Sequence, residues 1–168
     1  MTLQEKIDYI GRDKFVKITN TEEFPDLSKD LRELLKEIGI YSNRKGYPYL
    51  TTDGKLKRFN DSLIQFGEGV VGDPFCIDIK NKEKIVGYDL DSKNIRLINT
   101  SIVKYIECIY ELRYYTNEIE GFEKFGPYHK NHKKYAKEFQ KMLEKIEPKA
   151  MEYPTWGGRV YEMDLGVI

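Results

Sequence analysis

The side chains that could hold a metal ion are two histidines near the C-terminal third of the chain. His129 and His132 are three positions apart, so on a helix they would share one face and could bind a single ion. A zinc site needs four ligands, or three and a water molecule, and the flanking lysines would repel a dication. We therefore expect no metal site, and the solvated start of a helix is the simpler interpretation.

Acidic residues in the centre of the chain could act as a general acid and base if two of them faced one cleft. Asp78 and Asp89 neighbour apolar residues on expected strands, as solvent-facing residues do. The glycine-rich stretch at 67–73 lacks the Lys–Ser/Thr pair of a phosphate-binding loop, and no serine-nucleophile motif is present. We expect neither catalytic residues nor a cofactor, and hence no enzyme.

A stripe of lysines is the strongest charge feature. Lys137, Lys141 and Lys145 recur every four residues and so share one face of an expected helix at 131–146. One interpretation is a solvated outer face, and the other is a patch for an acidic partner or for phosphate groups. The 28 basic residues match 28 acidic ones, so direct binding of nucleic acid is not expected.

The elements that must position these residues follow from hydrophobic periodicity. Helical spacing of apolar residues predicts helices at 3–10, 27–38, 102–115 and 131–146, and 15–18 resembles a strand. Between them, apolar runs at 63–71, 75–79, 85–90 and 95–98 are separated by short turns and must pair as antiparallel neighbours. The first run is expected to continue through Val70 and Val71. We expect an α+β fold, with a β-meander sheet of about five or six strands and helices packed on it.

Length and composition favour one domain that spans residues 1–168. A chain of 168 residues can bury a core without a metal or a disulfide, and an aromatic content of 13% opposes disorder. Cys76 and Cys108 sit among apolar residues and are expected to be reduced and buried. We find no signal-peptide pattern and no run of about eighteen apolar residues, which predicts a cytoplasmic protein without membrane contact.

An ordered set of residues carries a resemblance to a known family. Gly72-Asp73 precedes the strand that begins at Phe75, Val86-Gly87-Tyr88-Asp89 follows a turn, and Asn99-Thr100-Ser101 leads into a helix that carries Tyr105. Phe24-Pro25 opens the expected first long helix, and Glu147-Pro148 with Trp156 closes the chain. In this order the residues resemble the SUKH superfamily of bacterial immunity proteins, its fourth subgroup most closely, which shares the fold of yeast cell-wall regulators. Residues 41–54 match no part of that pattern.

The resemblance implies a binding protein without catalytic activity. Such proteins bind a toxin encoded beside them, often a nuclease or a nucleic-acid deaminase, and block it in the cell that makes it. We therefore expect an immunity protein that occludes a secreted or contact-delivered cognate toxin. The alternative is a general protein-interaction or regulatory module of the same fold. The sequence leaves the oligomeric state open.

The long loop at 41–54 is the expected partner-binding surface. Loops that carry aromatic residues are often functional, and tyrosine and arginine are enriched at interface hot spots. Acidic residues nearby in the sequence would rim this side and suit a toxin with a basic substrate groove. The alternative is an ordinary covering loop whose tyrosines pack against the sheet. The expected surface comprises Tyr41, Arg44, Tyr47, Tyr49, Asp53, Asp61, Glu68 and Asp73.

Overall fold

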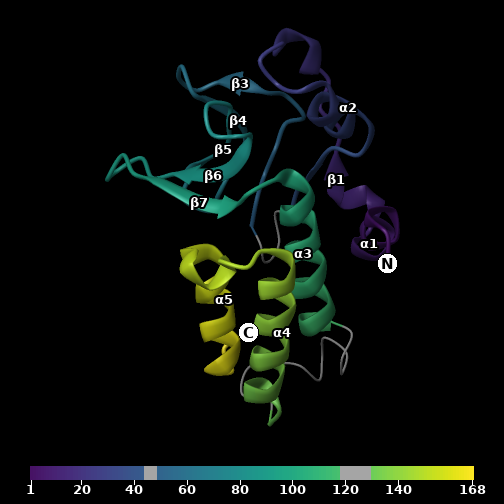
Figure 1. Ribbon diagram of the computed structural model, residues 1–168, viewed down its shortest axis with the longest axis vertical. Helices are drawn as coiled ribbons and strands as arrows, with labels where there is room; N and C mark the ends of the chain where they lie inside the picture. The colour runs from purple at the N-terminus through teal and green to yellow at the C-terminus, as the bar shows by residue number, and fades with distance from the viewer. Residues whose placement is uncertain (44–48, 118–129) are drawn as a thin grey trace. The chain divides into compact units, whose positions relative to one another are not determined.

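The computed structural model describes residues 1–43, 49–117 and 130–168, which form two compact units (Figure 1). One unit comprises Met1–Ile10 and Val103–Ile168 and is helical, whereas the other comprises Gly11–Ile102 and contains the strands. The predicted α+β class is confirmed. The assignment of 1–168 to one domain stays a prediction.

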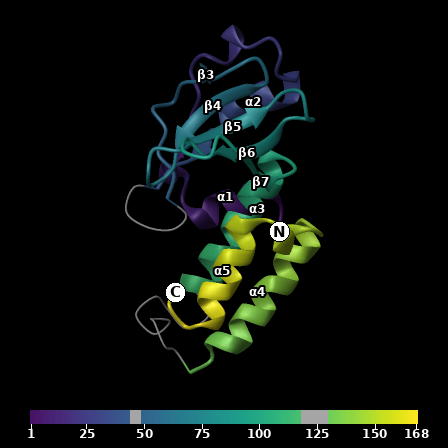
Figure 2. The same cartoon turned by 90° about the vertical axis from the view of Figure 1, so that its left-hand side faces the viewer.

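A five-stranded antiparallel sheet forms the centre of the unit Gly11–Ile102. The strands pair in chain order, and their labels follow one another across Figure 2, so the predicted meander is confirmed. Short connections explain this order, because a strand joined to the next by a few residues can only fold back beside it. The strands are β3 (Lys57–Arg58), β4 (Leu63–Glu68), β5 (Pro74–Asp78), β6 (Lys84–Tyr88) and β7 (Ile95–Asn99).

The first strand of the meander is shorter than predicted. β4 ends at Glu68, and the expected continuation through Val70 and Val71 is wrong. The backbone N–H of Gly69 donates to the carbonyl of Asp73 at 2.9 Å, which closes the turn to β5. The two valines therefore lie in an exposed turn instead of a strand.

Both faces of the central strands carry buried side chains. Ile77 lies opposite Ile64 on one neighbour and Ile85 on the other, and all three are buried. The alternate positions place Cys76 opposite Val86, and these two form a second apolar cluster with Leu63. Phe59, Tyr88 and Leu97 pack against that cluster and stay partly exposed.

A smaller sheet and one α-helix complete this unit. β1 (Phe15–Val16) pairs antiparallel with β2 (Ile40–Tyr41), and α2 (Lys29–Glu37) lies between them in the sequence. Ser28 caps α2, because its side-chain oxygen accepts the backbone N–H of Leu31, as serine often does at the start of a helix. Gly39 follows the helix with a φ of 94°, and a Cβ there would lie 2.3 Å from the carbonyl oxygen of Val16, so only glycine fits. Two short 3₁₀ turns, η1 (Arg12–Lys14) and η2 (Thr21–Glu23), join these elements.

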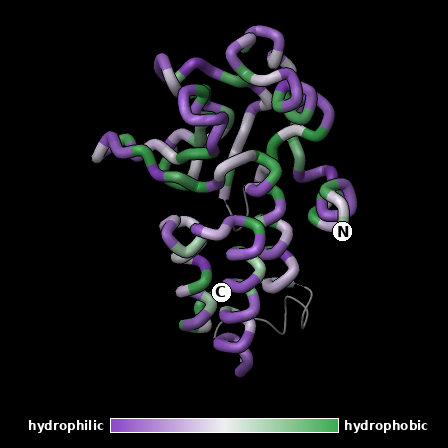
Figure 3. The backbone as a smooth tube through the Cα atoms, in the orientation of Figure 1, coloured by the Kyte–Doolittle hydropathy of each residue, from purple (hydrophilic) through white to green (hydrophobic). Residues whose placement is uncertain are grey.

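Aromatic packing and ion pairs hold the helical unit together. Trp156 is fully buried, with its ring centroid 6.4 Å from that of Tyr105. Lys6 pairs with Glu107 at 2.8 Å. In Figure 3 the helix at 132–146 is coloured mainly as hydrophilic, and the last helix is mixed. Its elements are α1 (Leu3–Ile10), α3 (Ile102–Asn117), α4 (His132–Ile146), η3 (Ala150–Glu152) and α5 (Pro154–Asp164). None of the helices in the described ranges has the length and apolar content needed to cross a bilayer.

Candidate functional site

The segment around Thr51 lies against the end of β4. The backbone N–H of Thr51 donates to the carbonyl of Glu68 at 3.0 Å, and the N–H of Glu68 donates back at 2.9 Å. Leu50 pairs in the same way with Asn43, which follows β2. Gly67 permits this approach, because a Cβ there would lie 2.7 Å from the carbonyl oxygen of Thr51. A glycine in the strand thus positions the second half of the predicted loop.

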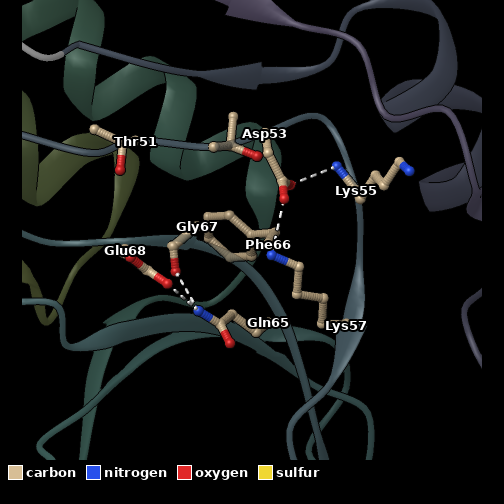
Figure 4. Close-up of a pocket in the computed structure, with 9 residues that line it drawn as sticks. Thr51, Asp53, Lys55, Lys57, Gln65, Phe66, Gly67 and Glu68 are labelled. Atoms are coloured by element: carbon tan, nitrogen blue, oxygen red, sulfur yellow. Dashed lines mark hydrogen bonds and ion pairs between the residues drawn. The ribbon is translucent and has the colours of Figure 1, made fainter.

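A hollow opens where this segment leaves β4 and returns to it as β3. Thr51 pairs with Glu68 and Lys57 pairs with Gln65, so five residues lie between the two pairs on one segment and only two on the other. The additional residues arch away from the strand and leave a space of about 220 Å³ (Figure 4). Its lining is formed by Thr51, Thr52, Asp53, Lys55, Lys57, Gln65, Phe66, Gly67 and Glu68.

An ion pair forms one wall of the hollow. Nζ of Lys57 donates to the carboxylate of Asp53 at 2.8 Å, and the backbone N–H of Lys55 donates to the same group at 3.1 Å. The hydrogen bond from Lys57 is the main cause that lowers the pKa of Asp53, and it raises the pKa of Lys57. Both side chains are more than half exposed, so the pair holds the local geometry and adds little stability.

Gln65 and Glu68 form the opposite wall. Nε2 of Gln65 donates to the carbonyl of Gly67 and to Oε1 of Glu68, both at 3.3 Å. In Figure 4 these two side chains lie together, apart from the Asp53–Lys57 pair. The amide orients the exposed carboxylate of Glu68 beside the hollow. The two walls therefore carry hydrogen-bond donors and acceptors, with a positive charge on Lys57 and negative charges on Asp53 and Glu68.

The chemistry of the hollow suits recognition of a polar group. The buried ring of Phe66 contributes an apolar surface and packs edge-on against Phe75, with centroids 6.3 Å apart. The hydroxyl oxygen of Thr52 already accepts the backbone N–H of Gly54.

In the described ranges no three His, Cys, Asp or Glu side chains gather as a metal site would require, and His129 lies outside those ranges.

Four of the eight predicted surface residues come together at one end of the sheet. Asp53 and Glu68 line the hollow. Tyr49 is partly exposed and lies two positions before Thr51. Asp73 immediately precedes β5, whose first residue pairs with Glu68, so this carboxylate is at the same end.

The other four predicted residues do not join this group. Tyr41 is a core residue with 1% of its surface exposed, and its ring lies 5.9 Å from that of Phe15, its partner across the small sheet. Its pairing in β2 buries it, so this tyrosine belongs to a strand and not to the exposed surface that was expected. Asp61 precedes β4 and lies at the end opposite Glu68. Arg44 and Tyr47 fall within 44–48, outside the described residues.

The sequence interpretation missed several lining residues. Gln65 interrupts the apolar run at 63–66, and a polar residue in such a run marks an outward position, so this signal was available. Thr51 and Lys57 carry no comparable signal, because their place depends on pairing with residues of β4 that are distant in the chain.

The lysine stripe lies on the exposed side of α4. Lys137, Lys141 and Lys145 are exposed, whereas Tyr135 and Phe139 of the same helix are buried. The predicted amphipathic helix is confirmed, and the choice between a solvated face and an anion-binding patch stays open at this stripe.

Comparison with known proteins identified no relative of this chain. A scan of protein-family models found no match. Searches of curated proteins and of solved structures also found no match. The functional assignment therefore rests on the residues of this chain and on the geometry described above.

Proposed function

We propose that this chain is an immunity protein of the SUKH type, which binds a cognate toxin and occludes it. The toxin is expected to be a nuclease or a nucleic-acid deaminase, delivered by secretion or by cell contact. The protein would act in the cytoplasm of the producing cell by binding alone, without catalysis.

The order of the matched residues along the fold is the observation that carries this proposal. Gly72 and Asp73 precede β5, and Val86-Gly87-Tyr88 forms the second half of β6. Asn99 ends β7 and is buried, and α3 begins three residues later. Tyr105 lies in that helix with its ring buried against Trp156. This order of strand, turn, strand and helix is what the proposal rests on.

The surface at one end of the sheet supports a role in binding. Tyr49, Asp53, Glu68 and Asp73 lie at that end, and the hollow that Asp53 and Glu68 line offers hydrogen-bonding groups of both charges. Polar groups held in place before binding favour specific recognition of a partner, since less side-chain entropy is lost on association.

Co-expression with the neighbouring toxin tests the proposal. The chain would be produced in cells together with the toxin domain encoded by the adjacent gene, and colony formation would be counted. We expect growth to recover with this protein, and no recovery when the same cells carry an unrelated toxin of the same enzymatic class.

Two outcomes would overturn the proposal. One is the absence of any growth-inhibiting product among the flanking genes, which would favour a general interaction module. The other is continued toxicity although the chain is present as folded protein, as judged by its circular dichroism after purification.

A further inference from the structure

The exposed apolar side chains of the unit Gly11–Ile102 gather at one end of its sheet. Among the described residues of this unit, the large hydrophobic side chains that stay exposed are Val70, Val71, Leu90 and Ile95, with exposed fractions of 69%, 78%, 49% and 52%. The valines lie in the turn from β4 to β5, Leu90 in the turn from β6 to β7, and Ile95 opens β7. One turn precedes β5 and the other follows β6. Because β5 and β6 are antiparallel, the start of β5 and the end of β6 lie at the same end of the sheet.

One hydrogen bond joins these two turns, and two more order the backbone of the second turn. Oδ1 of Asp73 accepts the backbone N–H of Leu90 at 3.2 Å, which ties one turn to the other. The carboxylate of Asp89 accepts the backbone N–H groups of Ser92 and Asp91 at 2.7 Å and 3.0 Å, and the bonds from Ser92 are the main cause that lowers its pKa. The apolar side chains are therefore presented by an ordered backbone.

The charge around these side chains is mainly negative. Glu68, Asp73, Asp89 and Asp91 flank the exposed hydrophobic residues. The basic residues beside them are Lys93 and Arg96, and Arg96 interacts electrostatically with Asp89, so the four carboxylates leave a negative balance. An apolar centre with a polar rim is the usual composition of a protein interface. A negative rim favours a partner whose own rim is positive, because complementary potentials accelerate association.

We propose that Val70, Val71, Leu90 and Ile95, here called the hairpin-end surface, dock a protein that presents lysine and arginine around a small apolar centre. This inference rests on the proposed function, since the partner would be the toxin, and it names the surface by which the toxin is held. The basic groove of an enzyme that acts on nucleic acid has the required charge. Occlusion of that groove would block access of the substrate.

A double substitution in the exposed turn tests the apolar centre. Val70→Ser/Val71→Ser removes two exposed apolar side chains, so the fold should not change. The probe is a catalytically inactive form of the toxin domain encoded by the adjacent gene, and affinity would be measured by calorimetry. We expect the affinity to fall about tenfold or more, as for central interface residues. The matched control is Val167→Ser, an exposed valine of the other unit, which should bind like the wild type.

A second pair of variants tests the charge of the rim. Glu68→Gln/Asp91→Asn removes two negative charges at this end, and Asp61→Asn removes one at the other end of β4. We expect the first variant to associate several-fold more slowly at low salt and to approach the wild-type rate at high salt. The Asp61→Asn variant should associate as fast as the wild type. Equal rates for all three proteins at low salt would overturn the choice of a basic partner.

The two proposals fail in different ways. If the wild type does not bind the toxin domain, the proposed function is wrong and this inference falls with it. If the wild type binds and the folded double valine variant binds equally well, the immunity function stands and the hairpin-end surface is wrong. If the wild type and the Val167→Ser variant bind and the double valine variant has lost affinity, the result supports the immunity function and the hairpin-end surface.

Discussion

Ser28 connects the start of α2 to the turn between β5 and β6. Its hydroxyl oxygen accepts the N–H of Leu31 at 3.3 Å, and its O–H donates to the carboxylate of Glu83 at 2.8 Å. Ser28→Ala removes the cap, so we expect the free energy of unfolding in urea to fall by about 1 kcal/mol. Ser92→Ala is the control, since its hydroxyl contacts the N–H of Asn94 at 3.4 Å and the carboxylate of Asp89 within an exposed turn and caps no helix. Equal losses in both variants would contradict a capping role.

The pKa of Asp53 reports the ion pair in the hollow. Its folded-state pKa is lowered mainly by the hydrogen bond from Lys57, so the stabilisation from this carboxylate is present above the unfolded pKa and is lost as pH falls through the folded pKa. Lys57→Met should raise the pKa of Asp53 toward its usual value, as measured by NMR titration of the carboxyl carbon. Lys55→Met is the matched control, because Lys55 contributes only a backbone N–H. A titration curve unchanged in the Lys57 variant would count against this ion pair in solution.

Cys76 is a core residue whose chemistry follows from burial. Desolvation raises the pKa of its thiol to about 12, so the reactive thiolate is scarce at neutral pH. Cys108 is buried as well. We expect neither cysteine to react with an aromatic disulfide reagent at pH 8 in the native protein, and both to react in concentrated urea. Rapid reaction of one thiol under native conditions would show that its surroundings open easily.

The contact between β4 and the segment at Thr51 depends on Gly67. An alanine Cβ at this position would lie 2.7 Å from the carbonyl oxygen of Thr51 and 2.9 Å from Leu50, so the segment or the strand must shift. We expect Gly67→Ala to lower the free energy of unfolding by about 1–3 kcal/mol. Hydrogen exchange at the N–H of Thr51 and Glu68 should accelerate.

Substitution of a second glycine, Gly158, is expected to change the free energy of unfolding in the opposite direction. Gly158 lies inside α5, and a Cβ there would meet no atom within 4 Å. Gly158→Ala should therefore stabilise the protein by about 1 kcal/mol, because alanine restricts the unfolded chain and favours the helix. If both alanine variants lose stability alike, close approach at Gly67 is not the cause.

Single elements show which features local sequence could predict. α1 ends before Gly11 and the cap of α2 is Ser28, and both features follow from neighbouring residues. The loops at 79–83 and 89–94, which separate β5, β6 and β7, contain the polar runs 80–83 and 91–94 that the sequence shows. The end of β4 was not predicted, because Val70 and Val71 resemble strand residues by type. The turn forms there since Glu68 pairs with Pro74, and that pairing is not visible in composition.

At the scale of the whole molecule, the two compact units carry different probes. Trp156 is buried in the helical unit, and Cys76 is buried in the unit that holds the sheet. The prediction of one domain requires both probes to report the same urea midpoint, since single domains of this size unfold cooperatively. Tryptophan fluorescence and the accessibility of the Cys76 thiol in a Cys108→Ala variant would be compared. Two separate midpoints would instead favour two domains.

Interactions between neighbours in the chain determined the α+β class, the order of the meander strands and the amphipathic character of α4. Periodicity and turn chemistry depend on residues a few positions apart, so the sequence alone contains them. Tertiary structure decided that Tyr41, which was expected in a partner-binding loop, is buried, and that Val71, which was expected in a strand, is exposed. It also brought Thr51 to Glu68 and so formed the hollow. These features depend on pairings between distant residues, whose free energy is set by packing and register instead of by local preference.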